Sequence, residues 1–305
     1  MNQMKGKTVA FRIGDACDLA LTVAPLALGM MLKILLTPPV EGISITGAQV
    51  YLTLRTPLQP WPITEAQINS WLVMIAITGL CLYLTHGIRA RVKTRRQLLA
   101  EWLVEKVDGM VKENMGDYFA GFGAFIAAIL ALSALSSLSS LLGLFPPTSD
   151  INVTAGWAIL IFVLITYYKM KGGLWHYIKS YGEPVPVLAP MNIISEVATP
   201  ISMAFRHYGN ILSGSIVSVL IASALSGLSA KLSRALPDAL GGFPFLRIGI
   251  PAVFSVYFDV FSGCLQAYIF AVLTMLYVSN GFPKAAFEQR RRRFEKKMKL
   301  QENQQ

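Results

Sequence analysis

The sequence predicts an all-α integral membrane protein with about six membrane helices. Of its 305 residues, 54% are hydrophobic and only 14% are charged, and the mean hydropathy is +0.52. These values lie well outside the range of soluble globular proteins. The apolar runs are long enough to cross a bilayer as helices, whereas a strand of a membrane barrel needs only about ten residues. The composition therefore excludes a soluble globular protein.

Six stretches are expected to form the membrane helices. The first contains Pro25, is flanked by Asp18 and Lys33, and follows three basic residues, as a signal sequence would. No small-residue cleavage site follows it and its apolar part is long, so a retained span is expected. The third is longer than a bilayer requires and is expected to tilt or to extend beyond the membrane. In order, the stretches are 16–37, 70–88, 118–145, 151–168, 184–230 and 248–277.

The distribution of basic residues orients the chain. Positive residues gather on cytoplasmic loops. If the N-terminus lies inside, 21 of the 27 lysines and arginines fall on the inner side and four on the outer side, with Lys33 and Arg206 inside spans. This asymmetry predicts a multi-pass protein of a bacterial inner (plasma) membrane with both termini in the cytoplasm. The basic tail, 284–305, is expected to touch anionic lipid and not nucleic acid.

An amphipathic helix is expected between the second and third spans, at residues 95–116. One of its faces carries Leu99, Trp102, Leu103, Lys106, Val107 and Met110. Such a helix can lie on the cytoplasmic leaflet or dock a partner helix, and both alternatives stay open. The sequence has no Gly-rich phosphate loop and no metal-ligand spacing, so neither a cofactor nor a metal is expected. The three cysteines are expected to be packing residues.

Arg206 is the most informative residue of the chain. Between Pro184 and Ala230 the only formal charges are Glu196 and Arg206. A guanidinium at bilayer depth costs from about 3 to more than 10 kcal/mol. Arginine cannot escape this cost by losing its proton. Arg206 therefore indicates a buried anion or a water-filled path that needs a permanent positive charge. An entry turn is expected before it, at the prolines 184, 186 and 190.

Polar side chains form two strips at helical spacing. Those that share a helical face with Arg206 are Ser202, Asn210 and Ser213, with Gly209 and Gly214 close by. The second strip, on the last stretch, contains Asp259, Ser262, Gly263 and Gln266. Arg206 and Asp259 alone would suffice to neutralise each other inside a bundle. Amides, hydroxyls and glycines on both helices favour a hydrated path between closely packed helices instead.

The residues around the two strips resemble the a subunit of F-type rotary ATP synthases. The run PMNIISEVATPISMAFRHYGN, from Pro190, contains that family's proline-asparagine entry and its Ser-x-x-x-Arg-x-x-Gly-Asn core. The run DVFSGCLQAYIFAVLTMLYVS, from Asp259, is similar to the family's terminal helix. The resemblance implies a membrane domain at 66–283 and a cytoplasmic tail at 284–305. It leaves 1–65 as an N-terminal extension with an additional span and an outer loop.

The resemblance also implies a role for the chain and for particular residues. The chain would be a non-catalytic stator subunit whose last two membrane elements form a long hairpin against a ring of c subunits. Arg206 matches the arginine that drives ion release from c-ring carboxylates and blocks leakage. The implied ion-pathway residues are Asn210, Ser215, Asp259, Ser262, Gln266, Glu196 and Asp150, and the implied c-ring contacts are Ser202, Ser213 and Gly214.

Two positions depart from the family pattern. Where the family usually has an exchangeable acid and a histidine, this chain has Ser215 and Asp259. We expect Asp259 to line the outer half-channel together with Ser215, Ser262 and Gln266. The inner half-channel is expected beside Arg206 and Asn210, with Glu196 contributing.

The implied partners are the c-ring, the b subunits of the peripheral stalk, other subunits of the synthase and lipid. The coupling ion, a proton or sodium, stays open. The alternative is a secondary transporter or channel that binds an anionic substrate through Arg206. Such a transporter would be expected to show internal repeats with matching broken helices. The sequence holds no second segment like that around Arg206.

Overall fold

The computed structural model describes residues 2–36, 47–55, 57, 59–88, 95–182, 185–233, 253–254, 256–285, 287–288 and 292. Within these residues, six helical segments are long and apolar enough to cross a membrane, which confirms the predicted fold class. They are Gly14–Leu36, Glu65–Thr85, Asp117–Leu142, Ile151–Met170, Pro186–Leu225 and Val256–Gly281. The last span was predicted to start at residue 248, and that start lies outside the described residues, as does most of the predicted tail.

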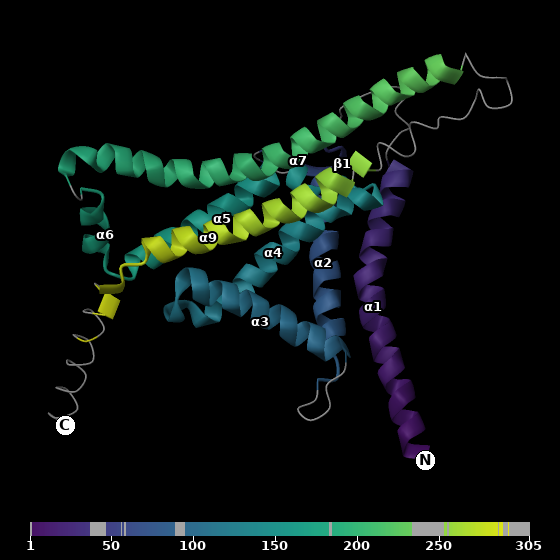
Figure 1. The fold of residues 1–305 in the computed structure, drawn as a ribbon, viewed down its shortest axis with the longest axis horizontal. Helices are drawn as coiled ribbons and strands as arrows, with labels where there is room; N and C mark the ends of the chain where they lie inside the picture. The colour runs from purple at the N-terminus through teal and green to yellow at the C-terminus, as the bar shows by residue number, and fades with distance from the viewer. Residues whose placement is uncertain are drawn as a thin grey trace.

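Helices α1 (Asn2–Leu36) and α2 (Glu65–Thr85) stand side by side and run in opposite directions (Figure 1). A Cβ atom at Gly79 would lie 2.7 Å from the backbone nitrogen of Thr22, so only glycine allows this approach. Polar contacts also join the two spans. Lys33 Nζ lies 3.7 Å from Glu65 Oε1 in an ion pair, and His86 Nδ1, just after α2, lies 3.1 Å from Asp18 Oδ2. The additional first span is therefore held on the second by packing and by polar contacts.

A short antiparallel hairpin precedes α2, within the segment predicted to be an outer loop. Strand β1 (Val50–Arg55) pairs with β2 (Pro60–Thr64). The second strand contains two prolines, which cannot donate to a ladder, so it lacked a sequence signal for a strand. Thr64 then caps α2, because its Oγ1 accepts a hydrogen bond from the Gln67 backbone nitrogen at 3.4 Å.

Helix α3 (Arg95–Met115) confirms the helix predicted at 95–116, but its apolar face is divided. Val111 and Met115 are buried near its C-terminal end. Toward its start, Leu99, Trp102 and Leu103 are exposed. The second half therefore packs on the bundle, and the first half offers an apolar surface to lipid or to a partner.

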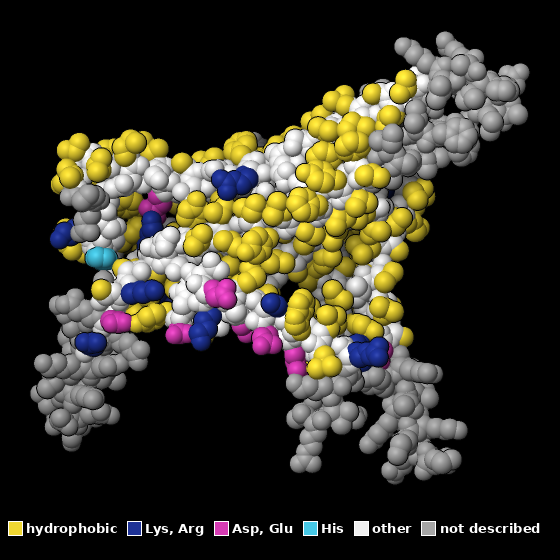
Figure 2. Space-filling view, viewed as in Figure 1, with side chains coloured by type: hydrophobic (Ala, Val, Ile, Leu, Met, Phe, Trp, Pro, Cys, Tyr) yellow, Lys and Arg dark blue, Asp and Glu magenta, His cyan; other side chains and the backbone are white. Residues whose placement is uncertain are grey.

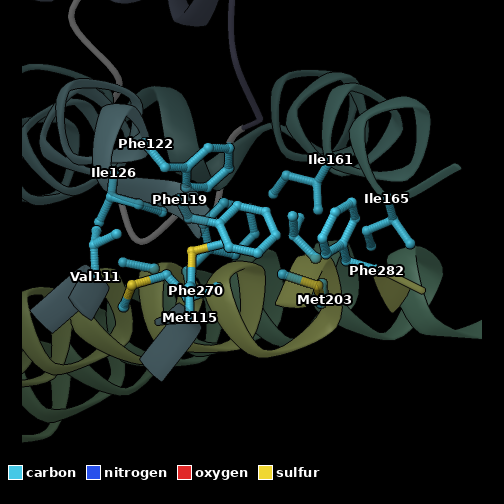
Figure 3. Close-up of a cluster of buried hydrophobic side chains, with 13 residues drawn as sticks. Val111, Met115, Phe119, Phe122, Ile126, Ile161, Ile165, Met203, Phe270 and Phe282 are labelled. Atoms are coloured by element: carbon cyan, nitrogen blue, oxygen red, sulfur yellow. The ribbon is translucent and has the colours of Figure 1, made fainter. Parts of the chain in front are cut away.

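Helices α4 (Gly123–Leu138), α5 (Ile151–Met170) and α9 (Gly263–Gly281) form the centre of the bundle. A 3-10 segment, Asp117–Phe122, leads into α4. Figure 3 shows the buried apolar side chains that fill the space between these elements. They include Val111, Met115, Phe119, Phe122, Ile126, Ile161, Ile165, Met203, Phe270 and Phe282. Met203 lies on α7, so the same core holds the helix that carries Arg206.

After the short helix α6 (Leu174–Ser180), the chain turns at Pro186–Leu188 and enters α7 (Ala189–Ser233), as the prolines predict. The 45 residues of α7 are roughly 68 Å long, more than twice the bilayer core. Figure 1 shows α7 and α9 running side by side, at a large angle to α1 and α2. This is the predicted long hairpin. The link between its two arms lies outside the described residues.

Charged side chains gather along one edge of the molecule in Figure 2, at the bottom of the view, below a broad hydrophobic surface. The beginning of α1, helix α3 and the end of α9 lie toward this same side in Figure 1. An apolar belt with charges at one edge is the pattern expected of a membrane protein with an uneven distribution of basic residues.

Candidate functional site

Arg206 lies near the middle of α7 on its exposed face. Its neighbours there include Ile201 and Phe205, which are 50% and 60% exposed. In the part of the chain that the structure describes, the guanidinium makes no hydrogen bond and no ion pair. The described residues therefore contain no Arg206–Asp259 pair. The charge of Arg206 is available to a group outside this chain.

The buried face of α7 determines where Arg206 points. Successive residues of an α-helix are about 100° apart. Met203, His207 and Ile211 are buried in the bundle, so Arg206 lies at the edge of the opposite face. Ser202 and Ser213 are exposed beside Arg206, as predicted.

Gly214 does not lie on the Arg206 face, although it is an expected c-ring contact. It is buried, and a Cβ there would lie 3.3 Å from Phe258 Cβ, inside the chain. Eight positions along a helix correspond to about 80° of rotation, which moves Gly214 from the Arg206 face to the α7–α9 contact. Ser215, nine positions from Arg206, is exposed and donates a hydrogen bond to the Leu212 carbonyl at 2.8 Å.

The predicted polar strips meet where α7 contacts the last helix. Ser262 Oγ donates to Asn210 Oδ1 at 3.1 Å, and Asn210 Nδ2 lies 3.5 Å from the Ser262 carbonyl oxygen. Gln266 is buried beyond them, and Asp259 is half-buried. Residues Val256–Ser262 form a π-helix, so Asp259 and Ser262 do not keep the regular helical spacing that we predicted.

A polar cavity of about 410 Å³ opens near the C-terminal end of α5. Glu196 Oε2 lies there 3.1 Å from Lys169 Nζ, and the Tyr177 hydroxyl donates to Glu196 Oε1 at 3.1 Å. A second cavity of about 200 Å³ shares the residues Lys169, Glu196, Thr199 and Tyr277 and continues to Asn280. Glu196 is predictable from the sequence, but its partners were missed because they lie on other helices.

Two tyrosines beside this cavity remain uncharged. The hydroxyls of Tyr177 and Tyr181 are hydrogen-bonded to each other. Burial raises the pKa of Tyr177 and of Tyr181, and the nearby Glu196 carboxylate acts in the same direction. Both phenols therefore stay protonated at neutral pH, and Tyr177 donates its hydrogen bond to Glu196.

A third cavity, of about 490 Å³ and separate from the other two, opens at the other end of α5. Asp150 lies at its edge and caps α5, because its Oδ1 accepts from the Asn152 backbone nitrogen at 2.9 Å. The hairpin and α2 supply the opposite wall. The lining residues are Trp61, Pro62, Thr64, Gln67, Ser70, Trp71, Asp150, Asn152, Val153, Gly156 and Trp157. Asp150, a predicted ion-pathway residue, thus lies at the opening of a cavity, and the β1–β2 hairpin forms part of the cavity wall.

Comparison with known proteins identifies the family. Residues 67–279 match the family model described as ATP synthase A chain. The chain belongs to this family. It is therefore a membrane subunit of the Fo part of an ATP synthase and is not catalytic by itself. This confirms the resemblance around Arg206 and leaves the alternative of a secondary transporter without support.

The curated relatives are bacterial and agree with the family match. The chain is 33% identical over 220 residues to ATP synthase subunit a of Acidothermus cellulolyticus, covering 69% of this chain and 73% of that protein. Identity to ATP synthase subunit a of Desulforamulus reducens is 31% over 221 residues, covering 71% and 78%. For Anoxybacillus flavithermus it is 30% over 242 residues, covering 71% and 96%.

Proposed function

We propose that this chain couples ion flow to rotation of a c-ring through Arg206 and two aqueous half-channels. Each c subunit presents a carboxyl group in mid-membrane, which must be neutral while it faces lipid. Beside Arg206 the ionised form of that group is favoured, so the group releases its ion into one half-channel. After moving past Arg206, it is reloaded from the other half-channel.

The proposal rests on the charge of Arg206, which has no ion-pair partner among the described residues. A cation at bilayer depth without an anion is strongly unfavourable, because its desolvation is not offset by an attraction. The α7 face around Arg206 carries apolar side chains and uncharged serines, and no described residue of the chain supplies an anion. A carboxylate on a neighbouring subunit meets this need. The exposed Ser202 and Ser213 fit the same interface, because small residues let helices approach closely.

The two cavities at the ends of α5 fit the two half-channels. The helix has 20 residues, so its ends are about 30 Å apart, which is the thickness of the bilayer core. We assign the cavity around Glu196 and Lys169 to the inner side and the cavity beside Asp150 to the outer side. The charged edge of the molecule supports cytoplasmic termini and this orientation.

Asp259 and the Asn210–Ser262 contact continue the outer half-channel toward the c-ring. The sequence placed Asn210 beside the inner half-channel, and we assign it to the outer one because it is bonded to Ser262. Asp259 is half-buried, and the neighbouring hydroxyl and amide form hydrogen bonds between the two helices. A carboxylate there can exchange a proton or hold a cation. Arg206, always charged, then separates the two half-channels and opposes direct passage of cations. The c-ring, the b subunits of the stalk and lipid are the partners of this arrangement.

The test replaces Arg206 in the assembled synthase in inverted membrane vesicles. We expect Arg206→Ala to abolish ATP-driven ion pumping, and Arg206→Lys to restore little of it, because an ammonium cannot form the bidentate contact of a guanidinium. Copurification of the c-ring with each variant controls for assembly. Coupled pumping at the wild-type rate in assembled Arg206→Ala complexes would refute the proposal.

A further inference from the structure

His207 occupies the centre of the buried face of α7. Its side chain is 0% exposed. Nε2 lies 3.2 Å from the Ser133 hydroxyl of α4, and the ring packs edge-on against Trp157 of α5 and Phe270 of α9. The other ring nitrogen, Nδ1, is buried and has no hydrogen-bond partner among the described residues. A histidine at this place therefore has an unused bonding site inside the bundle.

An unused polar atom in the bundle interior needs a reason. Buried polar groups in proteins are nearly always hydrogen-bonded, to protein or to water. An apolar side chain would fill the same space between Trp157 and Phe270 without this penalty. A buried water bonded to Nδ1 would satisfy the ring, and buried waters are regular components of such sites. The lack of a described hydrogen-bond partner for His207 Nδ1 therefore indicates that the nitrogen binds water or a proton.

His207 also lies between two parts of the outer half-channel. The outer cavity reaches Trp157, whose ring centroid lies 5.8 Å from that of His207. Three positions further along α7, on the same side of the helix, Asn210 is bonded to Ser262. On the α4 side, Ser137 donates to the Ser133 carbonyl at 3.1 Å and lies against Gly263. Polar groups of α4, α7 and the last helix thus lie on the side of the ring that faces the α7–α9 contact.

We propose that His207 is a proton-exchanging residue of the outer half-channel. Nδ1 of the neutral imidazole takes up a proton from water, which makes the ring an imidazolium, and later gives that proton to the next water on the way to the α7–α9 contact. The charge of the ring is therefore unchanged after each complete cycle of uptake and release. Histidine suits this role, because its imidazole can act both as a hydrogen-bond donor and as an acceptor and can take up and release a proton. The inference rests on the proposed function, and it requires that protons are the coupling ion.

Asp259 is the other proton-exchanging group that we assign to the outer half-channel, and it lies on the last helix, at the α7–α9 contact. Helix α4 carries no ionisable group along Gly123–Leu138. The ionisable groups of α5 lie at its opposite, inner end, and Arg206 lies on the exposed face of α7. The groups on the packed elements are Tyr167, Tyr168 and Lys169 of α5, Glu196, Arg206 and Tyr208 of α7, and Tyr257, Asp259, Cys264, Tyr268 and Tyr277 of the last helix.

The experiment compares His207→Gln with His176→Gln in the complete synthase in inverted vesicles. Glutamine keeps the hydrogen bonds but cannot bind a proton near neutral pH, and His176 is an exposed histidine of α6. Passive proton conduction through the membrane sector is measured from pH 6 to pH 8. We expect conduction in His207→Gln to fall about tenfold across this range, whereas His176→Gln matches the wild type.

A second variant tests the chemistry directly. In His207→Ala, added imidazole is expected to restore conduction, with no effect on the wild type. Copurification of the c-ring verifies that each variant assembles. Wild-type conduction across this pH range in His207→Gln, or no response to imidazole in assembled His207→Ala, would overturn the inference. So would a wild-type synthase that conducts sodium and not protons. None of these results affects the role of Arg206, which its own variants test.

Discussion

A methyl group added at Gly263 is expected to force α4 and α9 apart beside the site. The added Cβ would lie 2.7 Å from Ser137 Cβ, an atom fixed to the backbone of α4. Non-bonded carbons prefer about 3.5–4.0 Å, so the helices must separate by about 1 Å. Overpacking of this kind costs about 1–3 kcal/mol. The adjacent Ser262 moves with the backbone, so its 3.1 Å bond to Asn210 lengthens.

The assay combines stability with pumping. For Gly263→Ala we expect the purified synthase to lose this subunit at a lower temperature, and ATP-driven pumping to fall with it. Ser137→Gly removes the obstructing Cβ, so the double variant should recover most of the loss, a coupling that a double-mutant cycle measures. Gly109→Ala is the matched control, because a Cβ there meets nothing within 4 Å.

Two outcomes would contradict the close contact between Gly263 and Ser137. One is a Gly263→Ala complex with wild-type stability and pumping. The other is a double variant that is no better than Gly263→Ala alone, which would mean that the helices are not in the contact described.

Further predictions concern the two half-channels. Asp259→Asn should lower ATP-driven pumping by at least about tenfold, because an amide cannot exchange protons and a positioned exchanging group contributes about 10²–10⁴-fold where proton transfer limits the rate. Ser215→Ala is the milder partner of that test, since the hydroxyl is bonded to its own helix; a loss as deep as that of Arg206→Ala would show that the outer half-channel is wrongly assigned. At the inner opening, Lys169→Gln leaves Glu196 buried and without its cation. We expect this variant to pump more slowly than the double variant Lys169→Gln, Glu196→Gln, because removing both charges avoids an unpaired buried one. Equal rates in the single and double variants would contradict the pairing.

The sequence allows the membrane helices and Arg206 to be predicted because both are local signals. A hydrophobic run is recognisable from its own residues, and so is a single arginine within it. Asp150 and Glu196 are predictable as polar residues near the ends of spans. Their cavities are not, because Lys169, Tyr177 and Tyr277 are brought to Glu196 by three different helices.

Other features depend on exact rotation or on contacts between distant segments. Regular helical geometry places Gly214 about 80° around the helix from Arg206. Only the contact with Phe258 shows that this rotation turns Gly214 into the bundle and away from the Arg206 face. The π-helix at Val256–Ser262 changes the spacing around Asp259 and has no clear sequence signal. His207 resembles an ordinary interior residue in the sequence, and only its neighbours Ser133 and Trp157 reveal an unsatisfied nitrogen.

Arg206 is the residue on which the proposed coupling depends, and its role is tested by paired flux measurements on Arg206→Ala. In vesicles that carry the assembled complex, ATP-driven pumping and passive ion conduction are measured on the same preparation. We predict that pumping is lost while passive conduction persists or increases, because the barrier between the half-channels is removed and the c-ring carboxylates lose their cation. Pumping at the wild-type rate, with passive conduction unchanged, would contradict the account.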